Sequence, residues 1–208
     1  MIFELLKLNI NIPDNDFNAI YPAKIELLAR KHWSSVSACR LASEFLVDKP
    51  GTKVLDIGSG AGKFCLIGAA NTKGHFTGVE QRGDLVHLCN RLSESYQIHN
   101  VNFIHANITS INFTDYNAFY FYNSFYENID VLNSIDDTVR LDPQLYHKYS
   151  RHLVEQLASL PIGTRLVTLC SPLNIIPQSY RLQDTDPSGL LKFWEKVSEA
   201  MNPTLRKN

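Results

Sequence analysis

The sequence lacks several features that would assign it to a common functional class. Its 208 residues carry 20 Lys and Arg against 21 Asp and Glu, a formal net charge of −1, so it has no basic excess for binding nucleic-acid phosphates. The longest apolar runs, such as residues 118–122, fall far short of the roughly 20 residues that cross a bilayer, and the amino terminus has no basic segment followed by an apolar one. Its four cysteines form no C-x-x-C pair. These absences predict a cytoplasmic protein without a metal site and without a nucleic-acid or membrane partner.

The length and the apolar content favour one folded unit. At roughly 150 residues per domain, 208 residues predict a single domain with an extended terminus, and 44% hydrophobic residues are enough for a packed core. We expect residues 1–208 to form one domain, in which residues 1–50 are an amino-terminal helical lid or extension and residues 51–208 are the core.

Short apolar runs alternate with helical stretches from Lys53 onward, a pattern typical of a parallel α/β sheet. The predicted strands are 54–57, 76–79, 101–105, 118–122 and 166–169, and the predicted helices are 22–30, 34–47, 62–71, 83–97 and 143–160. Two further runs, 179–183 and 190–197, are joined too closely for a helix and must be antiparallel. The pattern therefore predicts a Rossmann-like, doubly wound, mostly parallel seven-stranded sheet with an antiparallel carboxyl-terminal hairpin and an amino-terminal helical extension.

The segment V-L-D-I-G-S-G-A-G-K at residues 54–63 is the most informative motif. A phosphate-binding P-loop would need a hydroxyl residue where Phe64 stands, and a dinucleotide fingerprint would need glycine where Lys63 stands. The remaining pattern, D-x-G-x-G-x-G with Asp56, Gly58 and Gly60 followed by Gly62, resembles motif I of the class I S-adenosylmethionine-dependent methyltransferases. The alternative is a tight strand-to-helix turn that binds no ligand.

The chemistry of this loop suits a small zwitterionic ligand. Alternate glycines leave the backbone bare where the strand turns into a helix, and the N–H groups at the start of that helix favour a carboxylate. Asp56 could accept a hydrogen bond from the ligand's ammonium group or orient the loop amides. The resemblance implies that S-adenosylmethionine, with S-adenosylhomocysteine as product, is the cofactor and that Gly58, Ser59, Gly60 and Gly62 line its site.

An acidic residue, Glu80, ends the next strand in the sequence F-T-G-V-E-Q-R. In the resemblance it binds both ribose hydroxyls, although an NAD enzyme could use an acid in the same way. Gln81 and Arg82 would flank the ribose and adenine, and for Arg82 an exposed helix start is an equal alternative. Asn107, after the third strand, stands where many family members have an acid that accepts from the adenine amino group, and its amide oxygen could accept that bond.

The fourth strand ends in N-S-F-Y, residues 123–126. Amino-methylating relatives often carry an N-P-P-Y-like tetrapeptide here, so the resemblance implies that Asn123 and Tyr126 position the methyl acceptor, and that Asn123 borders the cofactor. Both prolines are missing, which leaves the acceptor element open, and Asn123 could instead cap a loop. Phe125 could line the pocket or belong to the core.

Residues 30–36 place His32 and Trp33 between two predicted helices. Together with the F-x-G-V-E-Q-R and L-L-K-F-W-E-K segments, they resemble a group of small bacterial class I methyltransferases of unassigned substrate, in which an H-W-T-P-V segment precedes the core. We predict that His32 and Trp33 are part of a lid over the methyl donor. A packed helix corner is the alternative.

The resemblance implies methyl transfer to an unidentified small-molecule or protein acceptor by in-line displacement. Such a reaction depends mainly on alignment, which can supply roughly 7–11 kcal/mol, and His32, Tyr126 or Glu127 could deprotonate the acceptor. Two alternatives remain at this stage: a non-catalytic module that binds S-adenosylmethionine or another nucleoside, and an NAD-dependent oxidoreductase.

Overall fold

The computed structural model describes residues 2–199 and contains one seven-stranded sheet in the order β3-β2-β1-β4-β5-β7-β6. The strands are β1 (Lys53–Ile57), β2 (His75–Glu80), β3 (Val101–His105), β4 (Ala118–Phe121), β5 (Arg165–Leu169), β6 (Tyr180–Thr185) and β7 (Leu191–Lys196). β1 to β5 pair in parallel, whereas β7 is antiparallel to both β5 and β6. The predicted mostly parallel sheet and its terminal hairpin are confirmed.

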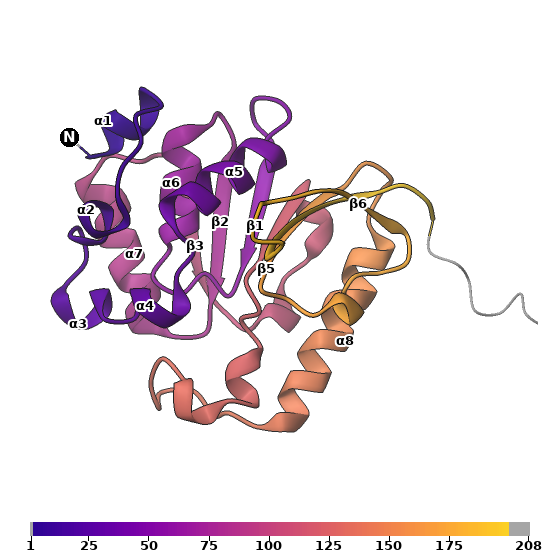
Figure 1. Cartoon of the computed structure of the whole chain (residues 1–208). Helices are drawn as coiled ribbons and strands as arrows, with labels where there is room; N and C mark the ends of the chain where they lie inside the picture. The colour runs from indigo at the N-terminus through magenta and orange to yellow at the C-terminus, as the bar shows by residue number, and fades with distance from the viewer. Residues whose placement is uncertain (1, 200–208) are drawn as a thin grey trace, which may run out of the picture.

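Helices cover both faces of this sheet (Figure 1). One face packs against α5 (Val36–Leu46), α6 (Lys63–Asn71) and α7 (Gly83–Ser95), and the other against α8 (Pro143–Ser159). Successive side chains of β1 point to opposite faces of the sheet. Val54 packs in the core beneath α5, α6 and α7, and Leu55 packs in the core beneath α8. α8 begins as its sequence predicts, because the Asp142 side chain accepts a hydrogen bond from the Gln144 N–H and Pro143 occupies the first turn.

The amino-terminal helices differ from the prediction. The segment 22–30 does not form one helix: α3 (Ala23–Glu26) and α4 (Ala29–His32) are separate single turns, and two short helices precede them, α1 (Ile2–Lys7) and α2 (Asp14–Asn18). No residue of α3 is buried, and a short helix without a buried face lacks the packing that would extend it. α5 begins after Ser35, whose hydroxyl accepts from the Ala38 N–H.

The connections after β3, β4 and β5 contain single turns of 3-10 helix in addition to α8. These are η1 (Ile108–Ser110), η2 (Phe113–Asp115), η3 (Tyr126–Asn128), η4 (Val131–Asn133) and η5 (Leu173–Ile175). Within residues 2–199, no helix is both long and apolar enough to span a membrane.

Candidate active site

A cavity of about 420 Å³ lies at the carboxyl ends of β1, β2 and β4. β2 and β4 lie on either side of β1, so the strand order reverses direction at β1: it continues to β2 and β3 toward one edge of the sheet and to β4 and β5 toward the other. Open α/β sheets bind their ligands at such a switch point. The cavity is bounded by four segments: the glycine loop, the end of β2, the N-S-F-Y segment with the chain that follows it, and residues 28–34 of the amino-terminal region.

The three motif glycines have different surroundings, although all have positive φ angles of 76°, 52° and 76° at Gly58, Gly60 and Gly62. A Cβ atom at Gly58 would collide with the Ser124 side chain, and one at Gly62 with the ring of Phe103. A Cβ at Gly60 would meet no atom within 4 Å. Gly58 and Gly62 therefore permit close packing, whereas Gly60 leaves its backbone open to the cavity.

Asp56 is the penultimate residue of β1, two residues before Gly58, and is 5% exposed. Its Oδ2 accepts a hydrogen bond from the Cys65 thiol at 3.4 Å. Burial raises the pKa of Asp56 to about 7, with the Cys65 hydrogen bond lowering it and the Glu80 charge raising it further. Asp56 is thus a cavity-lining carboxyl group that titrates near neutrality.

Glu80 lies at the end of β2 and is also 5% exposed. Its Oε2 accepts from the Gly60 N–H and its Oε1 from the Arg82 N–H, both at 3.0 Å. Burial raises the pKa of Glu80, while these hydrogen bonds and the Arg82 charge oppose the increase. The structure brings the predicted ribose-binding carboxylate directly beside the glycine loop.

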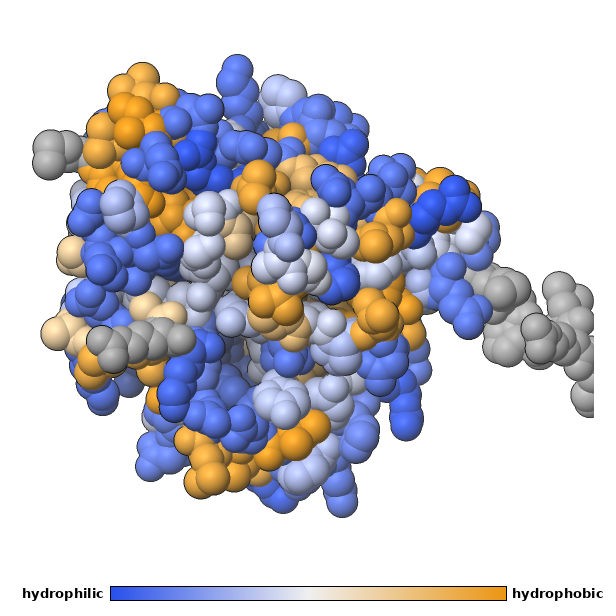
Figure 2. Space-filling view, in the orientation of Figure 1, coloured by the Kyte–Doolittle hydropathy of each residue, from blue (hydrophilic) through white to orange (hydrophobic). Residues whose placement is uncertain are grey.

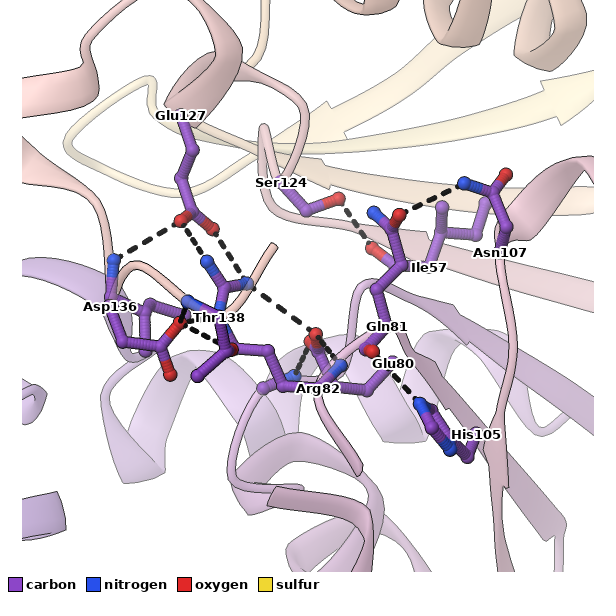
Figure 3. Close-up of polar contacts among 12 residues, drawn as sticks. Ile57, Glu80, Gln81, Arg82, His105, Asn107, Ser124, Glu127, Asp136 and Thr138 are labelled. Atoms are coloured by element: carbon purple, nitrogen blue, oxygen red, sulfur yellow. Dashed lines mark hydrogen bonds and ion pairs between the residues drawn. The ribbon is translucent and has the colours of Figure 1, made fainter. Parts of the chain in front are cut away.

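Gln81 and Asn107 are joined to each other (Figure 3). The Asn107 amide donates to Gln81 Oε1 at 2.9 Å and to the Tyr149 hydroxyl at 2.7 Å. Its Oδ1 accepts from both the N–H and the hydroxyl of Thr109, because Asn107 is the N-cap of η1. Gln81, Ala106 and Ile108 line the cavity, whereas Asn107 does not, and its oxygen is already engaged by Thr109.

The chain turns sharply after β4, which ends at Phe121, one residue earlier than predicted. Asn123 has a φ of 40°, and its N–H donates to Ser171 Oγ at 3.2 Å, which ties the turn to the end of β5. Ser124 Oγ donates to the Ile57 carbonyl at 2.7 Å, which ties it to the end of β1. The N-S-F-Y segment is thereby fixed to both neighbouring strands.

The side chains of this segment face different surroundings. Asn123 Oδ1 is buried without a hydrogen-bond partner among the described residues, in a residue that lines the cavity. Tyr126 lines the cavity mouth and is 47% exposed. Phe125 is buried against Phe121 and Tyr149, so it belongs to the core as well as to the cavity wall.

His32 and Trp33 also line the cavity. Burial lowers the pKa of His32, because the neutral imidazole is favoured away from water. Trp33 packs against Tyr21 with a ring separation of 4.5 Å. The predicted lid residues and the glycine loop therefore enclose the same space.

Two buried cations of this region, Lys63 and Arg82, form contacts that the sequence did not predict. Lys63, 4% exposed, donates to Asp14 Oδ1 at 2.5 Å and to Asn18 Oδ1 at 2.9 Å, so it connects the start of α6 to α2. Arg82 is 5% exposed and forms ion pairs with Glu127 and Asp136. The alternative that Arg82 is an exposed residue at the start of a helix is therefore wrong. Both partners are remote in sequence and carry no local motif.

The donor set and the space fit a nucleoside with an amino-acid end. Ser59 Oγ and Asn123 Oδ1 are buried cavity-lining atoms without hydrogen-bond partners in the part of the chain described, and such orphaned groups are expected to meet a ligand or water. The open space over Gly60 adds bare backbone to a lining that also contains the Asp56 and Glu80 carboxyl groups. No group of three or more His, Cys, Asp or Glu side chains within residues 2–199 is placed to hold a metal ion.

Comparison with known proteins agrees with this arrangement. A family model described as a methyltransferase domain matches residues 48–156. Among solved structures, TrmN from Thermus thermophilus superposes with a TM-score of 0.59 at 16% identity, covering 83% of this chain and 52% of that one. A putative methyltransferase, YhhF from Escherichia coli, gives 0.55 at 11% identity over 81% of this chain and 90% of its own. The chain thus spans about half the length of TrmN.

Two further structures indicate how broadly the fold is used. An S-adenosylmethionine-dependent O-methyltransferase from Thermotoga maritima gives a TM-score of 0.53 at 16% identity, covering 87% of this chain and 74% of that one. The [4+2]-cyclase SpnF gives 0.51 at 19% identity, covering 79% and 53%. No curated protein sequence matches the chain. At these identities the structures establish the fold alone.

The match to the methyltransferase model extends over more than half of the chain, and it includes β1, the glycine loop, β2 and β4. The seven-stranded sheet with an antiparallel β7 is the fold expected from the resemblance. The protein belongs to the class I methyltransferase family.

Proposed function

We propose that this protein transfers a methyl group from S-adenosylmethionine to a small-molecule or protein acceptor. The observation that carries the proposal is the pairing of an open, left-handed Gly60 with the Glu80 carboxylate at the rim of the cavity. When bound, S-adenosylmethionine supplies a methyl carbon that is already activated by its sulfonium sulfur.

The chain's own groups would hold the two ends of the donor. Glu80 would accept from the ribose hydroxyls with the lone pairs that Gly60 and Arg82 leave free. The N–H groups at the start of α6, which begins directly after Gly62, favour the donor's carboxylate. Asp56, in its ionised form, would accept from the amino group. Gln81 and Asn107 would border the adenosine. Because the Asn107 oxygen already accepts from Thr109, Asn107 would act mainly by holding the Gln81 side chain.

The acceptor would enter between N-S-F-Y and the lid. The unpaired Asn123 Oδ1 would accept from an N–H or O–H of the acceptor and orient its lone pair toward the methyl carbon. Tyr126 would border this entry. His32, held neutral by burial, would take the proton that an acceptor hydroxyl or ammonium must lose. Residues 1–50 would serve as the lid of a single domain, with Trp33 over the donor.

The experiment separates binding from turnover, because the fold likeness extends to a cyclase as well as to methyltransferases. S-adenosylmethionine, S-adenosylhomocysteine and NAD are titrated into the protein by calorimetry. S-adenosylhomocysteine production is then measured with size-fractionated cell extract, which distinguishes small from protein acceptors, and with Glu80→Ala protein as the background control.

Each outcome has a definite meaning. Binding of both adenosyl ligands with extract-dependent product formation supports the proposal. Binding without turnover across all fractions favours the non-catalytic nucleoside-binding module. Preference for NAD, or failure to bind any of the three, contradicts the proposed cofactor.

A further inference from the structure

Arg82 connects Glu80, at the end of β2, to two carboxylates in the chain after β4 (Figure 3). Its Nε donates to Asp136 Oδ1 at 2.8 Å and its second terminal nitrogen to Glu127 Oε2 at 2.7 Å. The other terminal nitrogen lies 3.4 Å from Glu127 Oε1 and 3.5 Å from Glu80 Oε1. One nearly inaccessible guanidinium therefore contacts three carboxylates, one beside the glycine loop and two in the chain after β4.

Those two carboxylates organise the segment 127–141, here called the wall segment. Glu127 Oε2 also accepts from the Ile135 N–H at 3.1 Å. Asp136 Oδ1 also accepts from the Thr138 N–H at 3.1 Å and the Thr138 hydroxyl at 2.7 Å. The first of these hydrogen bonds spans eight residues and the others are local, within a segment whose only regular structure is η4 and the end of η3.

The wall segment supplies much of the cavity surface away from the glycine loop. Its lining side chains include Asp130, Asn133, Ile135, Val139 and Leu141. Several of its apolar side chains point outward instead, as Figure 2 shows along the lower edge, and Ile129, Val131 and Leu132 are 46%, 51% and 93% exposed. With so few buried apolar anchors, its position depends on polar contacts: the buried ones to Arg82 and an exposed hydrogen bond from Lys31 to Asn133 Oδ1 at 2.7 Å.

The charges around Arg82 are unequal, with a single cation facing three carboxylates of which Glu80 is the most buried. Burial acts to raise the pKa of Asp136, but the hydrogen bonds from Arg82 and Thr138 outweigh it and hold that pKa below its usual value. A ligand that donates hydrogen bonds to Glu80 competes for the oxygen that Arg82 shares. The guanidinium would then be held more strongly by Glu127 and Asp136, which fixes the wall segment.

We propose that Arg82 is a positioning residue that couples occupation of the Glu80 site to ordering of the wall segment, and so prepares the acceptor side of the cavity once the donor is bound. This inference rests on the proposed function. Arg82 acts through Glu127 and Asp136, whereas Asn123 and Tyr126 are proposed to position the acceptor directly.

Hydrogen exchange of the full-length protein with and without saturating S-adenosylhomocysteine tests the coupling. In the wild type, the ligand should slow amide exchange both in the glycine loop and in residues 127–141, the latter by about tenfold, within the usual range for coupled sites. In Arg82→Gln, protection of the glycine loop should remain and ligand-induced protection of the wall segment should be lost. Arg82→Lys, which keeps the charge but lacks the planar five-donor guanidinium, should restore part of it.

Controls separate coupling from simple destabilisation. Arg91→Gln, an exposed substitution on the same helix α7, should behave as the wild type. Glu127→Gln tests the same contact from its less buried side if Arg82→Gln does not fold, and it should also lose the ligand-dependent change. A purely structural role for Arg82 would alter exchange equally in the free and bound states.

The outcomes distinguish this inference from the proposed function. Calorimetry precedes the exchange measurement, and failure of the wild type to bind S-adenosylhomocysteine contradicts the proposed function itself. Normal binding with the same wall-segment protection in Arg82→Gln or Glu127→Gln as in the wild type overturns the role of Arg82 alone.

Discussion

The Glu80 carboxylate accepts a hydrogen bond from the backbone N–H of Gly60 at 3.0 Å. The two residues come from successive strand-to-helix connections, since Gly60 follows β1 and Glu80 ends β2. The same carboxylate accepts from the Arg82 N–H through its other oxygen. The acidic residue therefore shapes the glycine loop as well as offering a ligand group to the cavity.

Replacement of Glu80 should weaken the binding of S-adenosylhomocysteine. Loss of a charge-assisted hydrogen-bond acceptor costs roughly 1.5–3 kcal/mol, which is about 10- to 150-fold in Kd. We expect Glu80→Ala to show the full loss by calorimetry and Glu80→Gln a smaller one, because the amide retains one acceptor oxygen. Asp84→Ala, an exposed change in the first turn of α7, is the matched control. Equal affinity of Glu80→Ala and wild type would refute the ribose assignment.

Substitution of Gly60 should remove cofactor binding without a clash inside the protein. Its φ of 52° strains an L side chain by roughly 1–2 kcal/mol, and the added side chain would occupy open cavity space. Gly189→Val is a matched control, because Gly189 has a φ of 71° and equally free surroundings in the β6–β7 hairpin. Thermal unfolding should show similar destabilisation of both variants, whereas calorimetry should show loss of binding in Gly60→Val alone. Retained binding in Gly60→Val would contradict the position of the ligand over the loop.

The sheet and the glycine loop were predicted correctly because residues that are neighbours in the sequence determine them. Buried strands appear as short apolar runs, and the sharp turn after β1 requires glycine, so the sheet and the loop could be read along the chain. The Lys63–Asp14 and Arg82–Glu127 contacts span 49 and 45 residues. Nothing in the sequence near either cation indicates its partner, and the separate α3 and α4 turns result from the absence of tertiary packing on α3.

Asp56 should make cofactor binding depend on pH near neutrality. Its pKa of about 7 in the free protein means that it is mostly protonated below pH 7, whereas an ammonium group of the ligand favours the ionised form. We expect the affinity for S-adenosylmethionine to rise by up to about tenfold per pH unit below 7 and to level off above it. Asp56→Asn should lose this dependence while keeping any pH effect that belongs to the ligand. Parallel pH profiles for the two proteins would contradict the contact.

The same carboxyl group should affect stability in the opposite direction. Its pKa is raised on folding from 3.8 to about 7, so the folded state binds more protons than the unfolded state between these values. The contribution of Asp56 to the free energy of unfolding is therefore fully present below pH 4 and lost as pH rises through 7. Urea denaturation at pH 5 and pH 8 should show a smaller stability difference for Asp56→Asn than for the wild type. If the stability difference between pH 5 and pH 8 were the same in Asp56→Asn and the wild type, a group other than Asp56 would bind the proton.

The contact between Lys63 and Asp14 should stabilise the amino-terminal region against the core. Removing one partner leaves the nearly inaccessible Lys63 ammonium with Asn18 as its remaining side-chain acceptor, a loss of about 1–2 kcal/mol, toward the lower end of the usual range because Asp14 is 45% exposed. Asp14→Ala should therefore lower the free energy of unfolding in urea, whereas Asp16→Ala, an exposed substitution in the same helix, should not.

A second substitution separates the charge from the packing. Lys63→Met removes the ammonium but keeps an unbranched side chain beside Phe17 and Trp33, and exchanging a buried ion pair for apolar groups is often close to neutral. Adding Asp14→Ala to Lys63→Met should then cost less than Asp14→Ala does in the wild type, because no buried cation remains unpaired and only the hydrogen bond from the Val36 N–H to Asp14 Oδ1 is lost. A double variant whose stability loss equals the sum of the single losses would contradict a direct interaction between the two residues.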